Sequence, residues 1–128
     1  MNNNIILIIG TLMMFIAISL GAFGAHLWQN ILIENATEKA FATASQYHFI
    51  HALALLWIGS YGKQNKQIMG WASSVMLVGI LIFSGSLYIL ALTNIRWLGA
   101  ITPIGGLCLL AAWAAITWVL IKSLKSRQ

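Results

Sequence analysis

Acidic residues are nearly absent from this chain of 128 residues, which has only two, Glu34 and Glu38. Both lie in one short connection between apolar segments, so no carboxylate falls inside an apolar stretch. Small proton-driven exporters depend on such an intramembrane carboxylate, and its absence argues against that class. A serine nucleophile would also lack the acidic residue that orients the histidine of a triad. We therefore expect no enzymatic activity.

Cysteine and charged residues are scarce as well. The single cysteine, Cys108, allows no internal disulfide, and we expect it to be a small buried hydrophobe. Charged residues make up 7% of the chain and hydrophobic residues 60%, with a mean hydropathy of +0.87. A soluble domain of this size needs more polar surface. The composition predicts an integral membrane protein and excludes a soluble catalytic domain.

Four apolar blocks are long enough to cross a membrane, which takes roughly 20 residues each. We expect a single all-α transmembrane domain over residues 1–128, a four-helix bundle with spans at about 5–27, 36–61, 69–92 and 97–122. Residues 29–34 are expected to form a loop. Asn35 and Glu38 have the spacing of a capping box, which predicts the start of the second helix near Ala36.

The only proline, Pro103, leaves two interpretations of the fourth span. Inside a helix it would remove a hydrogen bond and kink the backbone. Alternatively, Thr102 caps a helix whose first residue is Pro103, a position where proline is favoured. We favour a break or kink at Thr102-Pro103, with residues 98–101 as a short packed turn.

The basic residues predict the topology. With four spans, one side of the membrane carries five basic residues: Lys63, Lys66, Lys122, Lys125 and Arg127. The other side carries Lys39 and Arg96 against two glutamates. The positive-inside rule then places both termini in the cytoplasm. It also accounts for the net charge of +5 without a nucleic-acid partner. We expect a multi-pass protein of the inner (plasma) membrane.

Small residues predict where helices approach closely. Ala17, Gly21 and Ala25 fall four residues apart, so they form one stripe on a helix, and such stripes let a second helix pack tightly in lipid. The residues expected to pack or bend helices are Ala17, Gly21, Gly24, Ala25, Gly85, Pro103, Gly105 and Gly106.

Polar residues inside the apolar blocks predict a site. On the expected topology they gather in the outer half of the membrane, where we expect His26 to meet His51. A polar group in lipid needs a partner, and ionisable residues in spans are functional candidates. The expected polar pocket comprises His26, Tyr47, His51, Ser84, Ser86, Tyr88 and Thr102. The alternative is that these histidines only join neighbouring helices through hydrogen bonds.

The three histidines, His26, His48 and His51, are also the weak candidates for a metal site, or two of them for a pair of haem ligands. No carboxylate or second ligand motif supports either idea. We therefore expect neither a metal nor a cofactor.

Several motifs resemble those of a known family. The segments 21–26, 51–55, 83–90 and 99–106, together with Tyr47, resemble the bacterial membrane family called domain of unknown function 423, which includes relatives similar to transmembrane protein 256. The resemblance covers nearly the whole chain and implies a four-helix membrane protein without a known activity. In the family pattern a glycine commonly follows the first histidine and a glutamine usually stands at the position of His48. Here Leu27 follows the first histidine, so the resemblance favours His26, His51, Thr102, Pro103 and the Gly105-Gly106 pair and leaves His48 as a feature of this chain alone.

The leading functional hypothesis is a non-enzymatic accessory, scaffold or small-ligand-binding protein of the membrane. A small-solute transporter or pore is the second hypothesis, with Pro103 and Gly105-Gly106 beside a flexible pathway. The third is a redox subunit whose histidines contact haem or a quinone. Expected partners are the lipid bilayer and either a second copy or a larger membrane complex.

Overall fold

The computed structural model describes residues 1–61 and 65–127. This part of the chain is almost entirely helical and contains no β-strand, which confirms the all-α fold. In chain order the elements are α1 (Asn3–Ala25), α2 (Gln29–Asn35), α3 (Glu38–Tyr61), α4 (Lys66–Thr93), the 3-10 helix η1 (Arg96–Ala100) and α5 (Thr102–Lys125).

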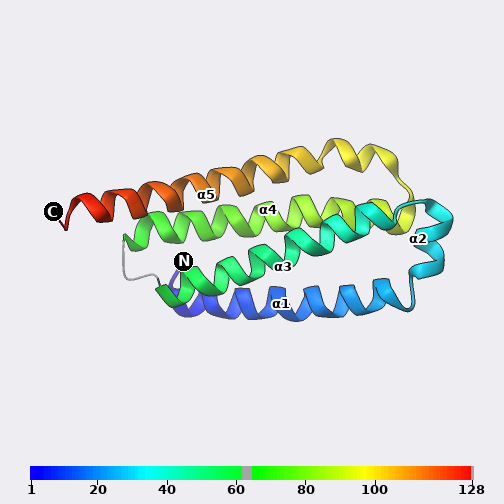
Figure 1. Ribbon diagram of the computed structural model, residues 1–128, viewed down its shortest axis with the longest axis horizontal. Coiled ribbons are helices and arrows are strands. Elements are labelled where there is room, and N and C mark those ends of the chain that lie inside the picture. Colours follow the sequence, from blue (N-terminus) through cyan, green and yellow to red (C-terminus); the bar gives the residue numbers. More distant parts are fainter. Residues whose placement is uncertain (62–64, 128) are drawn as a thin grey trace.

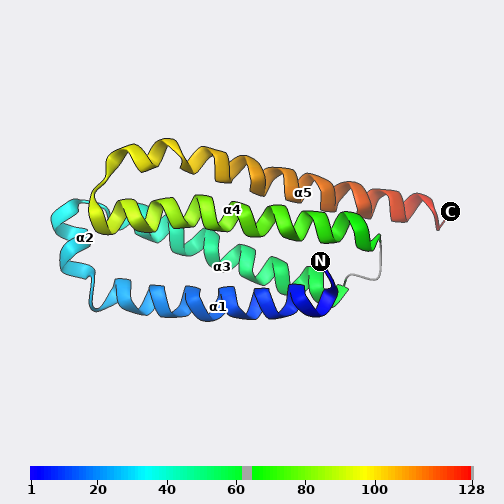
Figure 2. The ribbon, with the colours of Figure 1, turned by 180° about the vertical axis from the view of Figure 1, so that it is seen from behind.

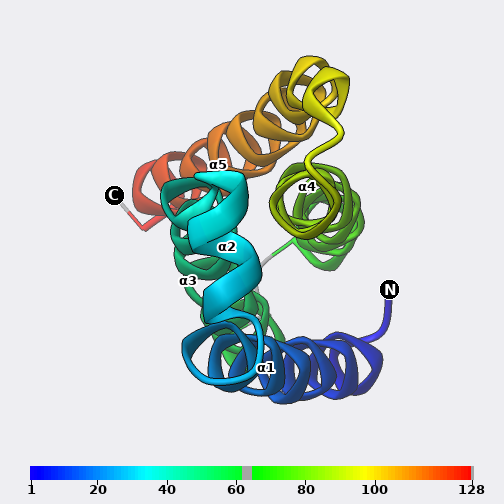
Figure 3. The same ribbon diagram turned by 90° about the vertical axis from the view of Figure 1, so that its right-hand side faces the viewer.

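The four long helices lie side by side in the order α1, α3, α4, α5, and neighbours run antiparallel (Figure 1, Figure 2). The backbones of successive helices in this order approach closely, and those of α1 and α4 barely do. Within the described ranges no Cα atom of α3 comes within 8 Å of one in α5. Viewed end-on, α1 and α5 lie on opposite sides, with α3 and α4 between them (Figure 3). The helices form an open row, where the sequence had suggested a bundle.

Three stretches are long and apolar enough to cross a membrane: Asn3–Ala25, Lys66–Thr93 and Arg96–Lys125. Helix α3 has 24 residues, a comparable length, but it is more polar. It begins with Glu38 and Lys39 and carries His48 and His51, both buried, further along. Of its polar side chains only these two histidines are buried, whereas Glu38, Lys39, Gln46 and Ser60 are exposed. The composition of α3 therefore does not by itself identify this helix as a membrane span, and four spans are not evident.

The connection between α1 and α3 differs from the expected loop, because residues 29–35 form α2. This helix ends in a Schellman motif: the N–H of Thr37 donates to the Leu32 carbonyl and that of Ala36 to Ile33, with Ala36 left-handed at φ 53°. Asn35 is thus the last residue of α2 rather than the cap of α3. The predicted capping box is wrong, and α3 begins at Glu38.

The predicted break before the last helix is present. Helix η1 ends at Ala100 and α5 begins at Thr102, with Pro103 in its first turn, where a missing N–H costs nothing. Thr102 does not cap α5, because no side chain caps this helix.

Glycines set the spacing of neighbouring helices. A Cβ atom on Gly24 would overlap the ring of Phe41 on α3, and one on Gly105 would overlap the backbone of Phe83 on α4. Ala17 is fully buried, whereas Ala25 is exposed. Gly85 faces open space, with nothing within 4 Å of an added Cβ. Close approach therefore occurs at only part of the predicted small-residue set.

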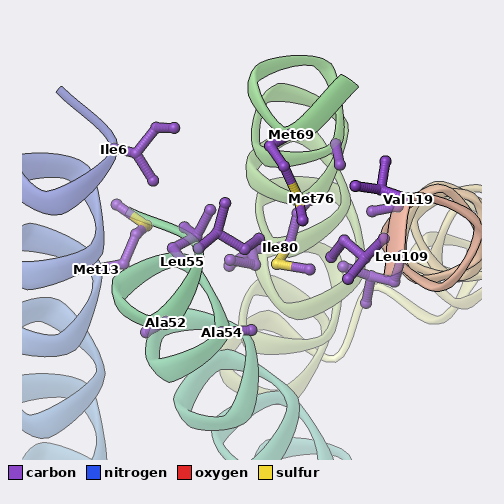
Figure 4. Close-up of a cluster of buried hydrophobic side chains, with 14 residues drawn as sticks. Ile6, Met13, Ala52, Ala54, Leu55, Met69, Met76, Ile80, Leu109 and Val119 are labelled. Atoms are coloured by element: carbon purple, nitrogen blue, oxygen red, sulfur yellow. The ribbon is translucent and has the colours of Figure 1, made fainter. Parts of the chain in front are cut away.

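The apolar core is shared by all four long helices. Figure 4 shows its central part, where Leu55 of α3 and Ile80 of α4 lie between Ile6 of α1 and Leu109 of α5. A second cluster, around Phe41 and Tyr88, packs beneath α2. Packing of this kind holds helices together in lipid, where expelling water contributes little.

Candidate functional site

His51 joins α3 to α5 through its imidazole. Its Nδ1 lies 2.7 Å from the backbone carbonyl of Tyr47, and its Nε2 lies 3.1 Å from the indole Nε1 of Trp113. A carbonyl can only accept and an indole N–H can only donate. The imidazole must therefore be neutral, with its proton on Nδ1 and its Nε2 accepting from Trp113.

This bridge spans helices whose backbones stay apart, so it leaves a groove between α3 and α5. The groove has a volume of about 700 Å³. Its lining is almost entirely apolar and aromatic: Tyr47, Ile50, His51, Phe83, Pro103, Gly106, Leu107, Leu109, Leu110 and Trp113. We call it the α3–α5 groove.

Aromatic rings form part of its walls. The ring of Tyr47 lies 4.4 Å from that of Phe83 and 5.9 Å from the imidazole of His51, nearly parallel to the latter. Trp113 meets His51 edge-on at 6.1 Å. The side chain of Leu107 is 67% exposed at the rim, so the groove opens sideways. None of the residues that line the groove is charged, since His51 is neutral.

Tyr47 is the polar group that remains available in the groove. Its hydroxyl makes no hydrogen bond within the part of the chain that the structure describes, and its side chain is 40% exposed. His51, in contrast, has both nitrogens engaged. The arrangement suits binding of an uncharged molecule, and His51 has no free nitrogen for proton transfer or ligation.

A second group of polar residues lies between α1 and α4. His48 is 4% exposed, and its Nδ1 lies 3.2 Å from the hydroxyl of Tyr88. Beside it, the Ser84 hydroxyl donates to the Ala44 carbonyl at 2.9 Å. These residues line a cleft of about 170 Å³ that is separate from the α3–α5 groove.

Ser86 and Thr102 form a third group. Their hydroxyl oxygens lie 2.7 Å apart, and both residues are buried. The pair links the C-terminal third of α4 to the first turn of α5. One hydroxyl donates to the other, whose own proton is directed to a nearby carbonyl, that of Phe83 for Ser86 or that of Leu98 for Thr102.

His26 is the remaining predicted site residue, and it lies apart. It follows the last turn of α1 and is exposed. Gly24, two residues earlier, packs on Phe41, which is ten residues from His51 along α3. Ten residues of helix correspond to roughly 15 Å. The structure therefore does not bring His26 to His51, and the seven predicted pocket residues occupy four places.

The three histidines do not gather either. Among the residues that the structure describes, no group of three or more His, Cys, Asp or Glu side chains could hold a metal ion. The set His26, His48 and His51 considered from the sequence thus has no geometric support.

Trp113 is the site residue that sequence reasoning missed. It stands 62 positions from the histidine that it contacts. Spacing cannot reveal such a pair. The one usable signal was chemical: a neutral histidine deep in a span needs a donor or an acceptor from another helix, and an indole N–H is one of few candidates.

Comparisons with known proteins give the same family as the sequence motifs. The family described as "Protein of unknown function (DUF423)" matches residues 20–106. The UPF0382 membrane protein SH2409 of Staphylococcus haemolyticus is 42% identical over 107 residues, covering 84% of this chain and 87% of the relative. No solved structure matches.

Two further relatives come from other bacteria. The UPF0382 membrane protein YwdK of Bacillus subtilis is 38% identical over 125 residues, covering 94% of this chain and 98% of the relative. The UPF0382 inner membrane protein YgdD of Escherichia coli is 38% identical over 116 residues, covering 89% and 87%. The chain is therefore a membrane protein and belongs to the DUF423 family.

Proposed function

We propose that this protein is a non-enzymatic membrane protein that binds a small, uncharged, flat-ring molecule in the α3–α5 groove. The observation that carries the proposal is the His51–Trp113 hydrogen bond. It joins two helices whose backbones do not approach each other. The space between them is lined by aromatic and aliphatic side chains.

The dimensions and chemistry of the groove fit this class of ligand. Small-molecule sites usually enclose about 300–1,000 Å³, with apolar walls and few polar groups. The groove has about 700 Å³ and offers the Tyr47 hydroxyl as a free hydrogen-bonding group. Since no charged residue lines it, an ionic ligand would lose its hydration without compensation.

We further propose that all four long helices span the inner membrane and that both termini are cytoplasmic. Both described ends of the chain lie at the same end of the row (Figure 1). The basic residues of that end are Lys66, Lys122, Lys125 and Arg127, with Lys63 outside the described residues. On this topology the α3–α5 groove opens towards lipid, and a membrane-dissolved ligand reaches it sideways. The apolar outer faces of α1 and α5 are then available to lipid, a second copy or a larger complex.

Equilibrium dialysis of the purified protein in mild detergent against menadione, a flat uncharged naphthoquinone, tests the ligand proposal. Gly106 lines the groove, and a Cβ added there would lie 3.7 Å from the Phe83 ring, in ordinary contact. Gly106→Leu should therefore fill the groove without breaking the fold.

We expect saturable binding to the parent protein and at least tenfold weaker binding to Gly106→Leu. Gly85→Leu, on the other side of the row, is the matched control and should bind as the parent does. Binding no greater than that of empty micelles, or equal binding by all three proteins, would contradict the proposal.

A further inference from the structure

The cleft between α1 and α4 has one unsatisfied polar atom. His48 is 4% exposed, its Nδ1 is paired with Tyr88, and its Nε2 is buried without any hydrogen bond. The backbone carbonyl of Met13 on α1 is near the ring, but it does not complete a hydrogen bond to Nε2. A buried polar group without a partner destabilises the folded state, because it has lost its bonds to water. Such a group in a cleft indicates that something else completes it.

The space beside Nε2 is larger than a water molecule needs. The cleft measures about 170 Å³. A dry apolar cavity of about 150 Å³ can bind benzene, whereas a buried water needs two to four polar partners. Apart from His48, the walls are mainly apolar side chains from α1 and α4, among them Ile16, Leu20 and Ile80. One apolar body with a single polar group fits this lining better than a cluster of waters.

The tautomers of His48 decide which polar group fits. If the Tyr88 hydroxyl donates to Nδ1, the proton of the imidazole is on Nε2, which then needs an acceptor. If the Tyr88 oxygen accepts from Nδ1–H, Nε2 is bare and needs a donor. A hydroxyl can do either, so a guest with a hydroxyl satisfies both tautomers.

The cleft is accessible from the side of the row. Helices α1 and α4 barely approach each other, and both pack on α3. Leu81 at the rim is 57% exposed, and nothing lies within 4 Å of a Cβ added to Gly85. A molecule dissolved in the membrane could therefore enter between the two helices.

We infer that the α1–α4 cleft is a second binding site, distinct from the α3–α5 groove, for a benzene-sized uncharged molecule with a hydroxyl group bonded to His48 Nε2. Phenols and short alcohols are the ligand class. This inference does not depend on the function proposed for the groove.

Fluorine NMR with two probes tests it. The probes are 4-fluorophenol and fluorobenzene, which differ only in the hydroxyl, titrated into the protein in fluorine-free detergent with empty micelles as the blank. We expect saturable binding of the phenol to the parent protein, about tenfold tighter than that of fluorobenzene, which corresponds to one hydrogen bond to a buried group.

Three variants locate the site. His48→Phe keeps a ring but removes the nitrogen, so the two probes should bind equally. Gly106→Leu fills the α3–α5 groove, so the probes bound by this variant report on the α1–α4 cleft, and it should keep the tenfold preference for the phenol. Adding Gly85→Leu to it fills the mouth of the cleft as well and should abolish the binding of both probes, which keeps the test valid if His48→Phe does not fold. Equal affinities of the two probes for the parent protein, or a phenol preference that survives in His48→Phe, would overturn the inference. So would the absence of saturable binding, which would leave only water in the cleft.

Discussion

The indole N–H of Trp113 donates to His51 Nε2 across 3.1 Å, and this bond joins two helices that have no backbone approach of their own. Helix α5 otherwise packs on α4 and η1. Among the described residues, the Trp113–His51 bond is the only side-chain hydrogen bond between α5 and α3; their other shared contacts are apolar.

Trp113→Phe should destabilise the protein by about 1 kcal/mol, because it leaves the buried Nε2 acceptor without a donor. The measurement is thermal or denaturant unfolding in detergent. Trp118→Phe is the matched control, since Trp118 is 54% exposed on the same helix and keeps a ring face for Lys122. A double-mutant cycle with His51→Phe should show coupling of similar size. Additive effects of the two substitutions would mean that the bond contributes nothing.

Two adjacent glycines of α5 should respond very differently to alanine. A methyl group on Gly105 would overlap the Phe83 backbone, which cannot move aside, whereas one on Gly106 would only touch the Phe83 ring at 3.7 Å. We expect Gly105→Ala to cost about 1–3 kcal/mol, as overpacking usually does, and Gly106→Ala to be neutral or slightly stabilising. Unfolding in detergent would compare them, and equal stability of the two variants would mean that α4 and α5 are further apart than described.

The hydroxyl pair Ser86–Thr102 should stabilise the start of α5. Ser86→Ala leaves the buried Thr102 hydroxyl without its partner, and Thr102→Val leaves the Ser86 hydroxyl without its partner. Their coupling in a double-mutant cycle should be about 0.6 kcal/mol, the average for hydrogen bonds between membrane helices. Coupling indistinguishable from zero would assign the helix break to Pro103 alone.

The corner where the end of α2 meets the end of α4 can be tested separately. The Ala91 carbonyl near the end of α4 accepts from the Thr37 hydroxyl at 2.7 Å and from the Asn35 amide at 3.1 Å. Thr37→Val keeps the shape and should cost about 1 kcal/mol by removing the shorter bond. In Thr43→Val, the control, the lost bond runs only to the carbonyl of Lys39 in the same helix, and stability should change by less than half as much. If both variants unfold alike, Thr37 does not hold the corner.

Sequence patterns predicted the structural features that depend on residues close together in the chain. The apolar blocks gave the long helices to within a few residues, and Pro103 gave the break before α5, because its ring restricts the backbone wherever it stands. The residues after His26 were predicted as a loop but form α2. The left-handed conformation that ends this helix falls on Ala36, where glycine would have been the expected signal.

The grouping of polar residues could not be predicted, since it depends on the order in which the helices lie. Placing His26, His51 and Ser84 in one pocket assumed a closed bundle with a common interior. In an open row the two sides of α3 face different spaces, so His48 and His51, only three positions apart, belong to separate sites. Helical spacing predicted that the two histidines lie close together on α3. The side chain of His48 bonds to Tyr88 on α4 and that of His51 to Trp113 on α5, so each faces a different space.

The order of the row has a consequence for biogenesis. Every long helix after α1 packs against the long helix that precedes it in the chain: α3 on α1, α4 on α3 and α5 on α4. Contacts between neighbouring segments form faster than those that close long loops. Each helix therefore finds its partner already in the membrane when it leaves the ribosome, and the chain can assemble in the order of translation without waiting for its C-terminus.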